Sequence, residues 1–325
     1  MRAQVLEPTL AGRRFEVLSD RQPTRSVAHL AVWTTFAVVA LLLMDVLDLT
    51  VYGVVIPVSG VLLALVMART DPPDPSIAWT RLVVDRADVI AIVALYAVIV
   101  GLFRLAFGVF GTDRVVGLFL SFAAALLVGV VGSVVYTTWI RRRPLASIGI
   151  GPQNLRSTLR LGLLLAAVQF SITLWGYDLP EPVDWVPLLV MAFTVGLFEA
   201  IFFRGFVQGR LEASFGVAPA VLGAAALYAL YHVGYGMGMD EMVFLFGLGV
   251  VYAIAYRLTE NVLVLWPLLI PMGSFYAQLD SGDLVGELPW ASIAGFGDVL
   301  VVMGVVAWFA HRSERRCRIP RLCQE

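Results

Sequence analysis

Charged residues are scarce in this sequence. Only 14% of the 325 residues are charged and 59% are hydrophobic, with a mean hydropathy of +0.85. In a soluble domain about a quarter of the residues are charged. The composition therefore excludes an ordinary soluble globular domain. Lysine is absent, so all 23 basic residues are arginine.

Cysteine and histidine are also rare, and both shortages limit the available chemistry. The two cysteines, Cys317 and Cys323, lie in a basic C-terminal tail, which excludes a disulfide framework. Of the three histidines, His29 lies at the start of the first apolar run and His311 lies at the start of the tail. His232 is therefore the only histidine that a site inside the membrane could use.

Long apolar runs dominate the rest of the chain. A membrane-spanning helix needs roughly 20 consecutive apolar residues, and runs that are continuous rather than alternating favour helices over barrel strands. The sequence predicts an all-α, polytopic membrane bundle of about 8–10 transmembrane helices. The candidate spans are 30–47, 51–68, 88–110, 115–140, 159–176, 185–208, 217–235, 241–257, 262–279 and 292–310.

Arginine is distributed unevenly among the segments that connect these spans. It concentrates before the first span, in the segment 141–158 and in the tail, whereas the alternate segments carry mostly acids. The positive-inside rule then places both termini in the cytoplasm, and we expect a multi-pass protein of the plasma membrane. The basic segment 141–158 suggests a division into an N-terminal extension of about four helices (1–140), a core (141–311) and a cytoplasmic tail (312–325).

A few ionisable residues fall inside the predicted spans, where a charge at a helix centre costs about 2.5–3.5 kcal/mol. They are Arg104, Glu199, Arg204, His232 and Asp298. Glu199 and His232 suit hydrolysis, because a carboxylate among apolar groups can act as a general base and an imidazole can orient the attacking water or share its proton. We therefore take them as the candidate catalytic pair.

Structural roles are open for the same residues. Glu199 can simply pair with a buried arginine, and a lone histidine near a helix end is more often a hydrogen-bonded packing residue. We expect Arg204 and Arg210 to anchor their helix end at the membrane interface. We expect the aromatic residues near His232 to lie at the interface as well. These aromatic residues are Tyr228, Tyr231 and Tyr235.

The predicted spans place the candidate pair at different depths. At about 1.5 Å per residue, Glu199 and His232 lie about 12 Å apart along the membrane normal. The two levels converge if the helix that contains Glu199 begins nearer 190 and continues to about 212.

Three stretches of the core form a familiar set: FEAIFFRG, LYALYHVGYG and GLGVVYAIAYRLTENVLVLWPLLIPMGSF. They resemble the CPBP family, the CAAX-processing and bacteriocin-processing intramembrane proteases, and the resemblance covers roughly residues 141–310. The family's first motif is two adjacent glutamates, three residues and an arginine. Glu199 and Arg204 match this motif, and Ala200 replaces the second glutamate. The second motif, an aromatic residue, three residues and a histidine, is matched by Tyr228 and His232.

The last motif of the family, a histidine, three residues and an asparagine, is lost. The register from Pro267 places Pro271 and Phe275 at its two polar positions. Ser274 and Gln278 share a helix face with position 271, so we expect them as replacement substrate or oxyanion ligands. Tyr228 is a further candidate for that role.

The resemblance implies a membrane-embedded peptidase in which Glu199 activates water with the help of His232 and Arg204. It also makes zinc a candidate cofactor. Catalytic zinc usually takes three protein ligands, and only Glu199 and His232 are available here, so no metal ligand is firm and a metal-free arrangement is favoured.

Three functions follow from these patterns. The first is an active but divergent intramembrane endopeptidase that cuts a membrane-associated protein or peptide. The second is an inactive binding or scaffold protein of the same fold, suggested by the three lost motif residues. The third is a transporter, suggested by the charges within the membrane. Membrane lipids are expected partners, and nucleic acid is not.

Overall fold

The first long helix starts at an aspartate cap. The Asp85 carboxylate accepts hydrogen bonds from the backbone N–H groups of Ala87 and Asp88, two of the donors that a helix start leaves free. Helix α5 (Arg86–Leu105) then continues as the π-helical segment η1 (Ala106–Phe110).

The structure is a computed structural model that describes residues 84–112, 114–152, 155–173, 185–274 and 289–317, together with Val55, Val58, Ser59 and Leu62.

A second long helix runs beside α5 after a turn at Gly111. Its consecutive segments are α6 (Val115–Phe122), η2 (Ala123–Gly132), α7 (Ser133–Val135) and η3 (Tyr136–Ile140). A Cβ atom added at Gly129 would collide with the ring of Phe198. Glycine at this position therefore lets η2 pack closely against the third long helix.

The third long helix contains the first motif. It consists of α9 (Trp185–Phe198), the π-helical segment η5 (Glu199–Gln208) and α10 (Gly209–Phe215). It continues seven residues beyond the predicted end at 208, so the predicted span was too short. The helix ends at Gly216, whose φ of 88° lies in a region that favours glycine.

The second motif lies on the next helix. Helix α11 (Val217–Leu230) tightens into the 3₁₀ segment η6 (Tyr231–Tyr235). After a turn through Gly236, α12 (Met239–Thr259) packs along α11.

The remaining described elements complete the bundle. They are η4 (Leu145–Ile148), α8 (Leu155–Thr173), η7 (Val262–Val264) and α14 (Pro289–Cys317). In the described part of the predicted span 262–279, η7 is followed by a turn and then by helical residues 269–274. The prediction of one continuous helix there was wrong, because proline removes a backbone donor and clashes with the preceding turn.

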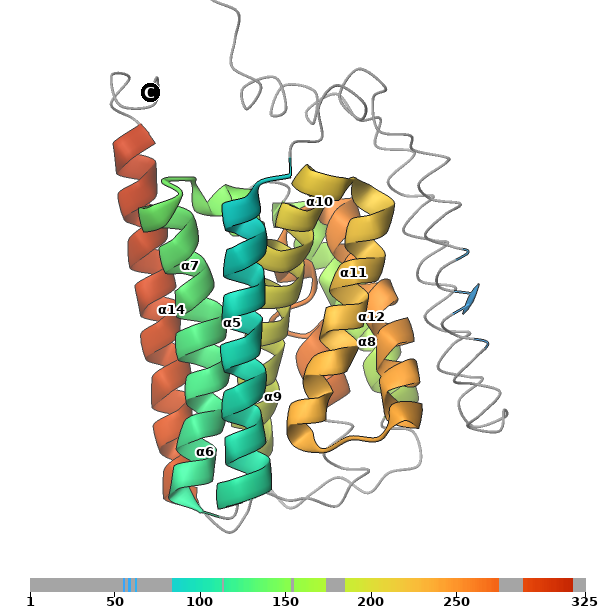
Figure 1. Ribbon diagram of the computed structural model, residues 1–325, viewed down its shortest axis with the longest axis vertical. Helices are drawn as coiled ribbons and strands as arrows, with labels where there is room; N and C mark the ends of the chain where they lie inside the picture. Colours follow the sequence, from blue (N-terminus) through green and yellow to red (C-terminus); the bar gives the residue numbers. More distant parts are fainter. Residues whose placement is uncertain are drawn as a thin grey trace, which may run out of the picture.

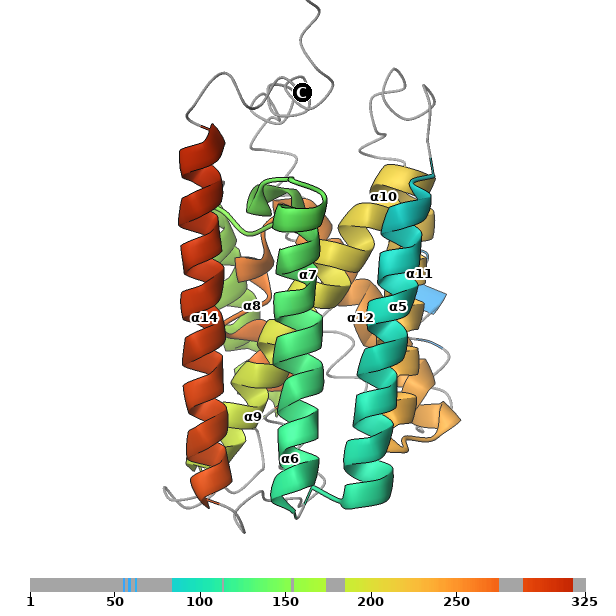
Figure 2. The ribbon, with the colours of Figure 1, turned by 60° about the vertical axis from the view of Figure 1, so that its left-hand side comes forward.

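Five helices among the described residues are long and apolar enough to cross a membrane. They are Arg86–Phe110, Val115–Ile140, Leu188–Phe215, Val217–Tyr235 and Glu241–Thr259. All regular elements in the described ranges are helices, and the long ones run side by side, with α14 at one edge (Figures 1 and 2). This confirms the prediction of an all-α, multi-pass bundle. The candidate spans 30–47 and 51–68 fall almost wholly outside the described residues.

Candidate active site

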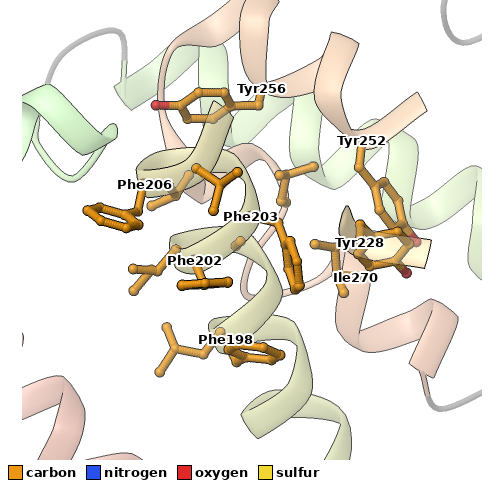
Figure 3. Close-up of a cluster of buried hydrophobic side chains, with 14 of the residues drawn as sticks. Phe198, Phe202, Phe203, Phe206, Tyr228, Tyr252, Tyr256 and Ile270 are labelled. Atoms are coloured by element: carbon orange, nitrogen blue, oxygen red, sulfur yellow. The ribbon is translucent and has the colours of Figure 1, made fainter. Parts of the chain in front are cut away.

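Segment η5 is fully enclosed by the bundle. All ten of its residues are buried, although they include Glu199 and Arg204. Phe198, Phe202 and Phe206 follow one another along this helix (Figure 3), with successive ring centroids 5.7 and 6.0 Å apart. The aromatic face packs against the bundle and fixes the rotation of η5.

The carboxylate of Glu199 is held by a tyrosine. The hydroxyl of Tyr231 donates a hydrogen bond to Oε1 of Glu199 over 2.5 Å. Glu199 is 3% exposed and Tyr231 is 1% exposed. A hydrogen bond to an ionised group is stronger than one between neutral groups, so Tyr231 orients the carboxylate. The expectation that Tyr231 lies at the membrane interface was wrong.

The ring of His232 is fixed by the backbone of its own helix. Its Nδ1 lies 2.9 Å from the carbonyl oxygen of Tyr228. A carbonyl oxygen only accepts, so Nδ1 donates, and in the neutral ring Nε2 is left with the lone pair. The His232 ring also lies against that of Tyr231, with centroids 4.0 Å apart.

Glu199 and His232 therefore both contact Tyr231, which places them at a similar level of the bundle. The predicted difference in depth of about 12 Å was wrong, because α9, η5 and α10 form one helix that continues to Phe215. Within the described part of the chain the two side chains share no direct hydrogen bond or ion pair. Tyr231 connects them by a hydrogen bond on one side and ring contact on the other.

Arg204 lies in the interior rather than at the interface. It is 0% exposed, and none of its three guanidinium nitrogens has a hydrogen-bond partner in the described structure. The guanidinium carbon lies 5.0 Å from the centroid of the Tyr228 ring, within range of a cation–π contact. The interface prediction was therefore wrong for Arg204. Ala200, which replaces the second glutamate of the family motif, offers it no carboxylate.

Arg210 is buried too, but it has partners. Its Nη2 donates to Oγ1 of Thr137, and its Nη1 lies 3.9 Å from the carboxylate of Asp88. With an exposure of only 4%, Arg210 joins α10 to the first two long helices.

The position of the lost histidine borders the same helix. A Cβ atom added at Gly196 would lie 2.6 Å from the Pro271 ring, so Pro271 packs one turn before Glu199. Ser274 is partly buried and ends the described helical residues 269–274. The candidate residues Phe275 and Gln278 lie outside the described residues.

The sequence analysis did not identify Gln169, a polar residue near position 271. The side-chain amide of Gln169 donates to the Leu269 carbonyl over 3.2 Å and accepts from the Gly273 N–H over 3.0 Å. These two hydrogen bonds join α8 to residues 269–274. A glutamine within an apolar run is the signal that could have found it.

The described residues do not fit a three-ligand metal centre. They contain no group of three or more His, Cys, Asp or Glu side chains close enough to share an ion. Oε1 of Glu199 is occupied by Tyr231, and Nδ1 of His232 is occupied by a carbonyl.

The assembled features are those of a helical membrane protein with a carboxylate, an arginine and an imidazole buried around tyrosines. Residues 181–270 match the family model described as Rce1-like, type II CAAX prenyl endopeptidase Rce1-like. The match confirms the family resemblance over that region, which is 90 of the 325 residues. It includes both motifs and ends immediately before Pro271. No curated protein and no solved structure matches the chain.

Proposed function

We propose that this protein is an intramembrane endopeptidase that hydrolyses a peptide bond in a membrane-associated protein or peptide. The observation that supports this most is the hydrogen bond from Tyr231 to Glu199, with His232 packed against the same tyrosine. It gathers a base, an orienting donor and an imidazole in the region that matches the peptidase family.

Glu199 acts as the general base in this proposal. With Oε1 held by Tyr231, the carboxylate takes a proton from water while that water attacks the carbonyl carbon of the substrate. The proton then passes to the amide nitrogen as the C–N bond breaks, leaving a carboxylic acid and an amine. General-base catalysis of this kind contributes about 10²–10⁴-fold to the rate.

His232 and Arg204 assist the base. The free Nε2 lone pair of His232 can accept a hydrogen bond from the attacking water, which orients it. Arg204 supplies positive charge and unpaired donors beside Tyr228, which favours the negative charge that develops in the transition state. Ser274 is the proposed oxyanion donor, in place of the lost histidine.

The second candidate is a proteolytically silent binding protein of the same fold. The packing of Pro271 against Gly196 favours it, because an apolar ring occupies the position that the family gives to a polar one. In this case Glu199, Arg204 and His232 only stabilise the fold and have no catalytic role.

The test compares Glu199→Gln with Glu241→Gln in the purified protein reconstituted into liposomes. Glu241 lies in the first turn of α12, where its carboxylate accepts from the Gly238 N–H, so it controls for the loss of one carboxylate. A library of membrane-anchored peptides is incubated with each variant and the new termini are identified by mass spectrometry. We expect cleavage by the wild type and by Glu241→Gln, and at least about a hundredfold loss in Glu199→Gln.

His232→Ala should lower the same cleavage, and a metal chelator should leave it intact. Cleavage that survives Glu199→Gln would rule out the proposed base. A wild-type protein that cuts no peptide, while it binds some of them, would favour the silent reading.

A further inference from the structure

Asp298 is a charged side chain on an otherwise apolar outer surface of the bundle. It lies on α14 and lines a groove between this helix and the segments α6 and η2. The other groove-lining residues are all apolar: Phe119, Phe122, Ala123, Leu126, Leu127, Val301 and Val302. Several of them are open to the surroundings of the bundle, with exposures of 61% at Phe119 and 65% at Val301.

Asp298 lies about a third of the way along α14, which has 29 residues. Asp298 is nine residues from Pro289, where α14 begins, which is about 13 Å along the helix at ~1.5 Å per residue. The hydrocarbon core of a bilayer is about 30 Å thick. The groove lies within an apolar span, because its residues on the second long helix begin at Phe119, four residues after the start of Val115–Ile140.

Asp298 has no partner within the described protein. It is exposed, and no hydrogen bond or ion pair joins it to any of the residues that the structure describes. The helix is turned so that Val299 and Val302, each 3% exposed, face the bundle. The carboxylate therefore lies at the edge of the groove, where a second helix could reach it.

We propose that this groove docks a transmembrane helix of a partner protein that carries a basic residue within its apolar span. Ionisable residues within a membrane are costly and pair with one another, so the sign of Asp298 selects a lysine or arginine. The apolar walls supply the packing that drives helix association in lipid. A second copy of this chain would bring another aspartate to the same surface. Repulsion between the two like charges disfavours such a homodimer. This inference holds whether or not the protein cleaves peptides.

The experiment measures energy transfer between the reconstituted full-length protein and synthetic single-span helices of leucine and alanine. The three helices carry lysine, leucine or glutamate at one central position. We expect the lysine helix to bind roughly threefold to tenfold more tightly than the leucine helix. Asp298→Asn should remove this preference, and Leu300→Asn, which places the same amide on an exposed neighbouring position, should retain it.

A cross-link locates the bound helix. In a variant with Cys317 and Cys323 replaced by serine, a cysteine at Val301 or Phe119 should form a disulfide with a cysteine near the central lysine. A cysteine at Val93, which is 61% exposed on α5, should not.

Equal binding of all three helices would overturn the proposal and leave the groove to lipid. Equal binding of the lysine and glutamate helices would overturn it as well, because the sign of the charge would then not matter. Cross-links between two copies of the protein at Val301, in the absence of any peptide, would assign the groove to a homodimer instead.

Discussion

At the scale of single residues, the hydroxyl group of Tyr231 helps to hold the buried carboxylate of Glu199. Tyr231 donates to Glu199 from the residue next to His232, so a single turn of 3₁₀ helix places both an orienting donor and an imidazole beside the acid. A hydrogen bond to a charged group contributes about 1.5–3 kcal/mol. In the proposed mechanism, this free energy holds the carboxylate of Glu199 in the orientation that it needs as the base.

We predict that Tyr231→Phe lowers kcat about tenfold to a hundredfold and leaves KM nearly unchanged. The ring and its packing remain, and only the donor to Glu199 is lost. Steady-state kinetics on a peptide identified in the cleavage screen would measure the two constants separately.

Tyr96→Phe is the matched control for this substitution. It also removes one hydroxyl hydrogen bond, from Tyr96 to the Leu227 carbonyl, but that hydroxyl does not contact the carboxylate. Equal losses of kcat in the two variants would mean that the Tyr231 hydroxyl acts only through stability and does not position the base.

At the scale of elements, the site depends on how closely η6 approaches α5. A Cβ atom built at Gly234 would lie 2.7 Å from Cβ of Phe103 and 3.4 Å from the Val100 carbonyl. Since η6 contains Tyr231 and His232, separation of these two elements moves both residues relative to Glu199.

Gly234→Ala is therefore expected to destabilise the protein by about 1–3 kcal/mol, as overpacking does, and to reduce peptide cleavage. Gly101→Ala, on the same α5, has no heavy atom within 4 Å of the added carbon. It should cost nothing or stabilise by up to ~1 kcal/mol. Thermal unfolding in detergent would compare the two, and equal stability would show that η6 shifts without strain.

A second prediction at this scale concerns the ionic cluster at the opposite end of α5. Asp88, with a side chain only 3% exposed, accepts from the Tyr136 hydroxyl at 2.9 Å and pairs with Arg143 at 3.0 Å and Arg141 at 3.2 Å. Asp88→Asn leaves the buried Arg210 without its carboxylate, so we expect a loss of about 3–5 kcal/mol.

Asp85→Asn is the control for Asp88. Asp85 is 31% exposed and pairs with Arg141, and asparagine keeps its capping role, so a loss below about 1 kcal/mol is expected. A similar fall in the unfolding temperature for both variants would show that the cluster is not held by the buried acid.

At the scale of the whole molecule, the ends of the spans define two opposite faces. The contact of Arg210 with Asp88 places the end of α10 beside the start of α5, and the turn after η6 then lies at the other end of the bundle. The arginine distribution predicts that the Arg141–Arg143 segment faces the cytoplasm.

Cysteine labelling tests this orientation. In a variant without native cysteines, Met237→Cys should react with a membrane-impermeant maleimide in intact cells, whereas Arg142→Cys should react only after permeabilisation. Both side chains are exposed. The reverse pattern would invert the bundle, and labelling of both from one side would contradict a spanning arrangement.

The sequence alone determined the fold class and the two motif residues. Apolar runs long enough to span lipid can satisfy their backbone only as helices, so the all-α bundle followed from composition. Glu199 and His232 stood out because acids and imidazoles are rare in such runs, and the structure brings both to Tyr231. Their catalytic roles stay predictions.

Only the tertiary structure decided which polar and aromatic residues face inward. A tyrosine in an apolar run can lie at the headgroups or in the core, and an arginine near a predicted span end can reach water or be enclosed; local sequence is the same in both cases. Because the helix with Glu199 extends to Phe215, Arg204 and Arg210 are enclosed and Tyr231 meets the carboxylate. Helix length and packing against distant segments, which no local pattern contains, set that outcome.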